Sequence, residues 1–310
     1  MAVNMKGKDL VSVHDLTTEE VYQILRTAEY VKMMNKTGSR FQPLSGKTLG
    51  MIFTKPSTRT RISFEVAIYE LGGYGLFLSA NELQLRRGET IADTARVLSR
   101  YIHGIMIRTF DHKDVVDLAH YATIPVINGL TDLLHPCQAL ADIFTIYEKK
   151  GRLDGLKLAY VGDGNNVAHS LMHAGAKVGM KVAVVTPEGY EPNPEVVRTA
   201  REDAAATGAE IILTNDPKEG VRDADVVYTD VWTSMGQEKE HDDRVAALTP
   251  YQVNPSLLAH AKQDVIFMHC LPAHRGEEVV DEVIDGPRSV VWDEAENRLH
   301  VQKAILALVM

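Results

Sequence analysis

A chain of 310 residues is long for a single hydrophobic core and suits two domains. Hydrophobic residues make up 45% of it and charged residues 24%, an ordinary balance that excludes a largely disordered chain. The net charge of −9 argues against binding to nucleic acid or anionic membranes, which requires a basic surface. Only Cys137 and Cys270 are available for disulfides, and no secretory signal or membrane span is legible, so we expect a cytoplasmic protein.

Strand-like and helical segments alternate along most of the chain. Residues 8–40 read as helical, with a capped start at 16–20. The expected strands are 49–53, 76–79, 104–108, 124–127, 156–161, 181–186, 210–214, 224–229 and 265–269. This order predicts an α/β fold with two doubly wound domains, each a mainly parallel sheet flanked by helices, linked by interdomain helices.

A polar, glycine-containing passage at residues 150–155 predicts the domain boundary. We therefore expect one domain over 1–150 and a second over 151–294. A last helix over 295–310 follows the final strand, and we expect it to pack back on the first domain. Polar residues that follow strands should gather at the carboxyl edge of each sheet, where such folds bind ligands.

Residues 53–61 place hydroxyls and two arginines where a helix begins. Pro56 stops the preceding strand, and Ser57 is a good N-cap. The first N–H groups of a helix and its dipole favour an anion, and the Arg59 guanidinium matches phosphate oxygens. Thr58 and Thr60 add hydroxyl donors. A capped surface helix with solvated arginines is the alternative, but strand, turn and helix together favour a phosphate site.

Two further strand ends of the first half carry polar groups. Arg108 ends a buried strand, where a guanidinium needs an anion or a carboxylate partner, so a structural salt bridge is an equal alternative. His135 precedes Pro136 at a helix start, and Gln138 lies one turn in. An imidazole and an amide there can polarise a carbonyl oxygen and hold an amide NH2 group, although His135 can also be a plain capping residue.

The sequence Gly-Asp-Gly-Asn-Asn-Val at 162–167 follows a strand and opens a helix. It is a partial dinucleotide fingerprint, because Val167 replaces the third glycine. The other interpretation is that Asn166 binds the polar end of a small substrate. His169 and His173 have the spacing of zinc ligands, but with no third ligand evident, packing histidines are the better interpretation.

Two turns of the second half complete the candidate site. Asp230 follows a strand and is placed to meet an ammonium group, and Ser-Met-Gly at 234–236 suits a closing loop, while the charged segment 237–244 is expected to be mobile. Pro272 ends the last strand, so the Cys270 and Leu271 carbonyls are free to accept hydrogen bonds. A Cys–His nucleophile is disfavoured, because His269 points to the opposite face of the strand.

In this order and spacing, four motifs resemble the ornithine carbamoyltransferases of the aspartate/ornithine carbamoyltransferase family. They are Ser-Thr-Arg-Thr at 57–60, His-Pro-Cys-Gln at 135–138, Asp230 with Ser-Met-Gly at 234–236, and His-Cys-Leu-Pro at 269–272. The resemblance covers the whole chain. It implies carbamoyl transfer from carbamoyl phosphate to L-ornithine in arginine metabolism, by a homotrimer whose active site lies between domains and near the subunit boundary.

The resemblance also implies roles at matching positions. The implied carbamoyl phosphate residues are Ser57, Thr58, Arg59, Thr60, Gln84, Arg108, His135, Pro136, Cys137, Gln138, Cys270, Leu271 and Arg298. The implied ornithine residues are Asn166, Asp230, Ser234 and Met235. Arg59, Arg108, His135 and Cys270 are the expected catalytic residues, and the reaction needs no metal or redox cofactor.

Three alternatives stay open beside that resemblance. An aspartate-specific relative would be expected to carry basic residues in place of Ser-Met-Gly and to lack Cys270, and a putrescine-specific one would have less use for Asp230. The third alternative belongs to a different class: the chain could be a non-catalytic, dinucleotide-binding regulator. The glycines at 162 and 164 are the only support for that hypothesis. It leaves Arg59, Arg108 and His135 unexplained.

Overall fold

The computed structural model describes residues 2–79, 88–234, 236 and 238–310. The chain forms two compact units, one made of Met1–Phe144 with Asn297–Met310 and the other of Thr145–Glu296. The helices α5 (Pro136–Lys150) and α12 (Val291–Val309) each run through a change of unit. Among the described residues, no helix is long and apolar enough to cross a membrane.

The first unit is built on a four-stranded parallel sheet in the order β2-β1-β3-β4. Its strands are β1 (Thr48–Phe53), β2 (Tyr74–Ser79), β3 (Gly104–Arg108) and β4 (Val126–Leu130). Its other helices are α1 (Thr18–Lys36), α2 (Thr58–Glu70), α3 (Ile91–Tyr101) and α4 (His112–Tyr121). All strands point the same way, so the segments after β1, β3 and β4 leave the sheet at one edge.

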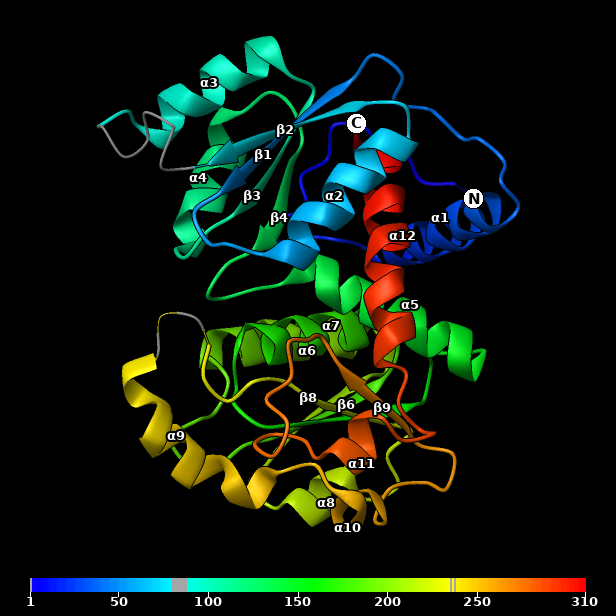
Figure 1. Ribbon diagram of the computed structural model, residues 1–310, viewed down its shortest axis with the longest axis vertical. Helices are drawn as coiled ribbons and strands as arrows, with labels where there is room; N and C mark the ends of the chain where they lie inside the picture. The colour runs from blue at the N-terminus through cyan, green and yellow to red at the C-terminus, as the bar shows by residue number, and fades with distance from the viewer. Residues whose placement is uncertain (1, 80–87, 235, 237) are drawn as a thin grey trace. The chain divides into compact units, whose positions relative to one another are not determined.

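Helices cover both faces of this sheet (Figure 1). On one face, α3 and α4 bury Ala95, Val115 and Leu118 against the aliphatic side chains of the strands. On the other face α2 passes close over β2, because a Cβ added at Gly75 would lie 3.0 Å from Ile68 Cγ2. Burial on both faces explains the continuous apolar strands in the sequence.

The second unit is built on a five-stranded parallel sheet in the order β7-β6-β5-β8-β9. Its strands are β5 (Lys157–Val161), β6 (Lys181–Val185), β7 (Glu210–Thr214), β8 (Val226–Thr229) and β9 (Ile266–His269). Its α-helices are α6 (Asn166–Lys177), α7 (Pro194–Thr207), α8 (Pro217–Val221), α9 (His241–Leu248), α10 (Pro255–Leu258) and α11 (Asp281–Ile284). Two 3-10 turns, η2 (Glu238–Glu240) and η3 (Thr249–Tyr251), flank α9.

Two helical layers enclose the second sheet as well (Figure 1). The helices α8, α10 and α11 bury Val221, Leu257 and Ile284 on one face, together with Val161 and Phe267 of the strands. On the other face α6 lies close to β6, where a Cβ added at Gly175 would come within 2.3 Å of Val182 Cγ2. The predicted fold class is therefore confirmed, with two doubly wound parallel sheets.

All nine predicted strands are present, and most of their ends agree to within two residues. The capped start of the first helix is also confirmed, because Thr17 and Glu20 form a reciprocal capping box. The charged segment 237–244, which the sequence predicted to be mobile, forms η2 and the first half of α9 in its described residues from 238 onward. One cation of that segment, Arg244, is buried with acidic partners.

Candidate active site

The first turn of α2 carries the hydroxyl and arginine cluster expected from the sequence. Ser57 is the N-cap, with an extended backbone, and its Oγ accepts a hydrogen bond of 3.2 Å from the Thr60 N–H. The Ser57 hydroxyl keeps its own proton to donate. Thr58 and Arg59 are exposed there, whereas Thr60 is buried. The helix start therefore combines hydroxyls, first-turn backbone N–H groups and a guanidinium, as an anion site requires.

Arg298 of α12 links this helix start to α5. Its guanidinium donates to Gln138 Oε1, and it lies 3.5 Å from Thr60 Oγ1. The other end of the Gln138 amide donates to Asp142 Oδ1 at 2.7 Å. Both ends of that amide are thereby oriented, and α2, α5 and α12 are joined in the first unit. The predicted residues Thr60, Gln138 and Arg298 are brought together, although 160 positions separate Gln138 from Arg298 in the sequence.

His135 lies in a strongly electropositive environment. Burial, followed by the positive charges of Arg298, Arg108 and Arg59, lowers its pKa well below the usual range. The imidazole is therefore neutral at pH 7 and can donate through only one of its ring nitrogens. Three guanidinium groups that act on one buried, neutral imidazole make an electrostatic environment that favours an anion.

The thiol of Cys137 faces the protein interior. It donates to the Asn128 carbonyl at 3.4 Å, and burial raises its pKa to about 12. A thiol with that pKa stays protonated and is a poor nucleophile. Any contact of Cys137 with a substrate would use its backbone N–H, on the first turn of α5.

Lys55 is a cation of the same region that the sequence analysis did not single out. Although a lysine, it is only 4% exposed; its ammonium pairs with Asp132 and lies 4.3 Å from the centre of the Phe110 ring. The position of Lys55 in the sequence, between β1 and the N-cap Ser57, could have identified it. Arg108 ends β3 next to β1 and is 6% exposed, as the buried strand predicted.

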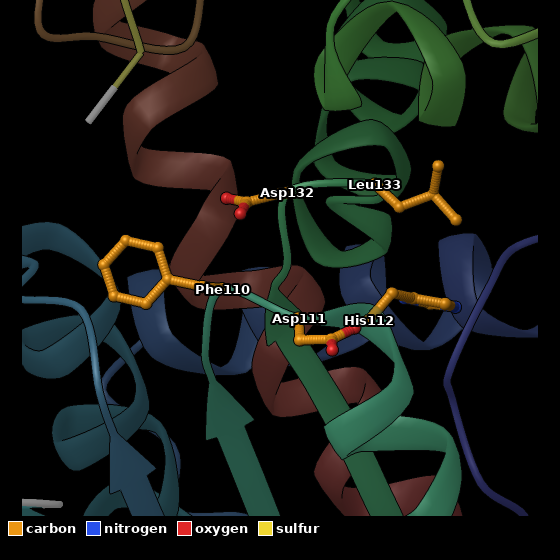
Figure 2. A pocket seen from close by; sticks show the side chains of 5 residues that line it. All are labelled: Phe110, Asp111, His112, Asp132 and Leu133. Atoms are coloured by element: carbon orange, nitrogen blue, oxygen red, sulfur yellow. The ribbon is translucent and has the colours of Figure 1, made fainter. Parts of the chain in front are cut away.

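A pocket of about 440 Å³ opens at the same edge of the first sheet. Figure 2 shows its lining side chains on the turns that follow β3 and β4 and at the start of α4. They are Phe110, Asp111, His112, Asp132 and Leu133. Burial is the main cause of a lowered His112 pKa, and its Nδ1 lies 3.0 Å from Thr131 Oγ1. None of the site residues predicted from the sequence lines this pocket. The pocket is therefore separate from the predicted site arginines, which are Arg59, Arg108 and Arg298.

In the second unit, Asp230 is the centre of a hydrogen-bonded group at the carboxyl edge of the sheet. Asn165 donates from Nδ2 to Asp230 Oδ2 at 2.8 Å, and the Cys270 thiol donates to Asp230 Oδ1 at 3.1 Å. These residues follow three adjacent strands, β5, β8 and β9. The structure therefore brings together Asp230 and Cys270, which the sequence singled out separately, and the carboxylate is oriented by two donors.

Asn165 was missed from the sequence, which pointed to its neighbour Asn166. Asn165 is the N-cap of α6, where its Oδ1 accepts from the Val167 and Ala168 N–H groups. Because its oxygen is used for capping, its amide nitrogen is directed to Asp230. The preference of asparagine for N-caps was the available signal.

The turn after β9 is held by a buried histidine and a buried glutamate. The Leu271 N–H donates to His269 Nδ1 at 2.9 Å, so the ring carries its proton on Nε2, which lies 3.0 Å from Glu278 Oε1. Leu271 has a left-handed backbone with φ of 59°. His269 thereby fixes the turn that carries the Cys270 and Leu271 carbonyls, while the Cys270 thiol is directed to Asp230.

Histidine pairs suggestive of metal binding have protein partners instead. His169 accepts from the Asn193 N–H at 2.9 Å, and His173 pairs with Asp203 at 3.2 Å. The donor atoms of Asp230, His269 and Cys270 lie within 4.8 Å of one another, but both ring nitrogens of His269 are already engaged. A metal at either place would have to displace one of these partners.

Gly164 has a packing role. A Cβ added at Gly164 would lie 2.4 Å from the Pro192 nitrogen and 2.6 Å from the Tyr190 carbonyl oxygen. The Gly164 N–H donates to that same carbonyl at 2.9 Å. This glycine is needed because a neighbouring loop crosses it, and not to admit a pyrophosphate.

Asp163 lies between these two glycines and was not singled out by the sequence analysis. It is 8% exposed and pairs with Arg244 at 3.2 Å. Burial raises its pKa to about 6 against the opposing effect of Arg244, and Asp230 and Glu240 raise it further. Two of the predicted binding residues, Gln84 and Met235, lie outside the described part of the chain. Ser234 is half-buried in the loop after β8.

Sequence and structure comparisons identify the relatives of this chain. A family model described as the carbamoyl-P binding domain of aspartate/ornithine carbamoyltransferase matches residues 8–148. The model of its Asp/Orn binding domain matches residues 154–309.

Individual relatives match over the whole length. The ornithine carbamoyltransferase of Thermococcus kodakarensis is 66% identical over 310 residues, which is 100% of this chain and 98% of that protein. The anabolic ornithine carbamoyltransferase of Pyrococcus furiosus is 63% identical over the same span. Among solved structures, the ornithine carbamoyltransferase from Pyrococcus furiosus superposes with a TM-score of 0.97, covering 100% of this chain and 99% of that one.

Proposed function

Because the chain belongs to the aspartate/ornithine carbamoyltransferase family, we infer that it transfers the carbamoyl group of carbamoyl phosphate to the δ-amine of L-ornithine. The products are L-citrulline and phosphate. A 63% identical relative is named as an anabolic enzyme, which supports a role in arginine biosynthesis. The first unit is assigned to carbamoyl phosphate and the second to ornithine, in line with the two family domains.

In the first unit, Ser57, Thr58, Arg59, Thr60 and Arg108 are proposed to hold the phosphate. The observation that carries this assignment is the convergence of three guanidinium charges on the buried, neutral His135. A neutral imidazole can donate to the carbamoyl oxygen without adding a further positive charge.

The carbamoyl group itself is assigned to the polar groups around the start of α5. His135 donates to its carbonyl oxygen, while Gln138, held by Arg298, meets its amino group. The carbonyls of Cys270 and Leu271 are proposed to accept from the same NH2 group. Gln84, Pro136 and Cys137 keep the supporting contacts that the family resemblance implies.

In the second unit, the Asp230 carboxylate is proposed to bind the α-ammonium group of ornithine. Its two oxygens are oriented by Asn165 and Cys270, so it is prepared for a cation before the ligand arrives. Asn166, Ser234 and Met235 are assigned to the remaining polar groups of the amino acid. These residues are proposed to recognise the α-amino acid group of ornithine, and putrescine has no such group.

The chemistry requires a neutral δ-amine that attacks the carbamoyl carbon. The carbon–nitrogen bond forms as negative charge builds on the carbonyl oxygen, and Arg59, Thr60, Arg108 and His135 are proposed to stabilise this charge. The carbonyl then re-forms, the bond to the phosphate oxygen breaks, and phosphate leaves with the pair of electrons. The attacking nitrogen gives up its extra proton, and the departing phosphate is proposed to accept it. Holding both substrates makes the reaction effectively unimolecular.

The test is formation of ureido products by the purified protein. Carbamoyl phosphate is supplied with ornithine, putrescine, aspartate or lysine in separate reactions, and the product is measured colorimetrically. We expect strong preference for ornithine. Preference for another amine would overturn the acceptor assignment alone, and no product with any amine would favour a binding protein, for which dinucleotide titration is the following measurement.

A homotrimeric assembly in the cytoplasm is also proposed. The trimer follows from the family resemblance, and the location from the sequence composition.

A further inference from the structure

Arg244 is a buried arginine on α9 whose guanidinium meets several loops of the second unit. Its Nη1 lies 3.2 Å from Asp163 Oδ2 and donates to the Trp232 carbonyl at 3.3 Å. Its Nε donates to Glu240 Oε2 at 3.2 Å, and its Cζ lies 5.3 Å from the centre of the Tyr190 ring. The residue is only 7% exposed, although it lies in a strongly charged segment.

The segments that Arg244 joins are those that carry the candidate acceptor residues. Asp163 lies in the turn after β5, two positions before Asn165. Trp232 lies in the loop after β8, between Asp230 and Ser234, and its side chain is 1% exposed. Arg244 therefore contacts both the turn after β5, through Asp163, and the loop after β8, through the Trp232 carbonyl.

Asp163 and Arg244 form a pair that is costly to bury. The pKa of Asp163 is raised to about 6 because burial outweighs the attraction of Arg244, and the carboxylates of Asp230 and Glu240 add repulsion. A guanidinium stays charged at all ordinary pH values. Buried ion pairs contribute little net stability, and in some proteins they instead specify one structural arrangement.

We propose that Arg244 is a positioning residue for the amino-acid acceptor, because it fastens the loop that carries Asp230 to the turn that carries Asn165. This inference rests on the proposed function of the second unit. Arg244 need not touch the substrate. It acts by holding the Trp232 carbonyl and the Asp163 carboxylate at fixed positions, so that Asp230 and Asn165 stay within hydrogen-bond distance of each other.

The planar guanidinium is essential to this role. It presents donors in a fixed fork and can bond Asp163, Trp232 and Glu240 at the same time. A lysine ammonium in the same place is a point charge on a flexible stem and would keep at most part of this set. We therefore expect charge alone to be insufficient.

The experiment compares steady-state kinetics of Arg244→Gln and Arg244→Lys with the wild-type protein, using citrulline formation. We expect the KM for ornithine to rise about tenfold or more in Arg244→Gln and by less in Arg244→Lys, because small displacements of binding groups are costly. The KM for carbamoyl phosphate should change by less than about twofold. Arg222→Gln, at an exposed arginine of the same unit, is the matched control and should leave both constants unchanged.

A second variant separates positioning from stability. Asp163→Asn combined with Arg244→Gln removes both buried charges and should recover the melting temperature that Arg244→Gln alone loses. We expect the KM for ornithine to stay raised in this double variant. If that KM returns to the wild-type value together with the melting temperature, or never rises in Arg244→Gln, the inference is wrong.

The outcome is distinguishable from a failure of the proposed function. Citrulline formation by the wild-type protein tests the reaction by itself, whatever the variants do. If the wild type forms citrulline and all variants share its ornithine KM, only the role of Arg244 is overturned. Should Arg244→Gln not fold, Arg244→Lys and the double variant supply the same comparison.

Discussion

Arg59 and Arg61 lie two positions apart at the start of α2 but have different surroundings. The Arg61 Nε bonds Glu65 at 3.0 Å, and its guanidinium stacks 3.9 Å from the centre of the Phe77 ring. Arg59 instead contributes to the positive field that lowers the pKa of His135. An arginine thus packs on an aromatic ring at one position and contributes positive charge to the proposed phosphate site at the other.

We expect Arg59→Ala to lower kcat/KM for carbamoyl phosphate by about 3 kcal/mol of transition-state stabilisation, as for a lost oxyanion donor. Arg61→Ala, measured in the same assay, should change kcat/KM by less than about threefold, since its ion pair is exposed. Wild-type kinetics in Arg59→Ala would contradict the phosphate assignment.

Asp230 and Asp225 are buried carboxylates near opposite ends of β8. Asp230→Asn should raise the KM for ornithine by about a hundredfold, because the α-ammonium group loses its countercharge. Asp225 accepts from Lys262 Nζ and the Lys157 N–H, so Asp225→Asn should lower the melting temperature without this selective change. Equal effects of Asp230→Asn on both substrates in initial-rate kinetics would argue against its role.

His135 makes the stability of the protein sensitive to acid. Its folded-state pKa lies well below the ordinary value of 6.5, so the unfolded chain binds the proton more readily. The stability contributed by the neutral ring is present above pH 6.5 and is lost as the pH falls below that value. We expect thermal melting of His135→Gln to change less between pH 7.5 and about 5.5 than that of the wild type. The same substitution at exposed His120 should leave the wild-type slope, and an unchanged slope in His135→Gln would contradict the assignment.

The start of α2 does two things at once, because Ser57 both caps the helix and faces the proposed phosphate. Thr17 is an equivalent cap on α1, where it bonds the Glu20 N–H at 3.2 Å. Ser57→Ala and Thr17→Ala should each cost about 1 kcal/mol of unfolding free energy in urea titrations. Only Ser57→Ala should also raise the KM for carbamoyl phosphate, and equal kinetics in both variants would reduce Ser57 to a cap.

Whether a segment is a strand or a helix was well predicted, because for most segments the neighbouring residues decide it. The strands are continuous apolar runs, and Pro136 opens a helix as expected. The helix α9 was missed since its acidic residues and its arginine gave no apolar stripe. Its buried face depends on Arg244 meeting Asp163, a partner 81 positions earlier, which no local pattern reports.

Assembly concerns the molecule as a whole. Several large apolar side chains of the first unit are exposed, including Tyr69 at 77%, Tyr74 at 65% and Ile62 at 54%. Where such side chains form one contiguous patch, they mark an interface between chains. Sedimentation velocity should give about three times the chain mass of 34.3 kDa. A single species of the chain mass at micromolar concentration would overturn the trimer.

By itself, the sequence determined the order of strands and helices, the two-sheet class, and the residue types available for an anion and an amino acid. These follow from hydrophobic periodicity and capping, which act over a few neighbouring residues. Tertiary structure decided which polar side chains meet: Arg298 with Gln138, Asn165 with Asp230, and Arg244 with Asp163. Those pairs are formed by strands and helices that become neighbours only when the sheets assemble, and burial then sets the charge of His135 and the pKa of Asp163.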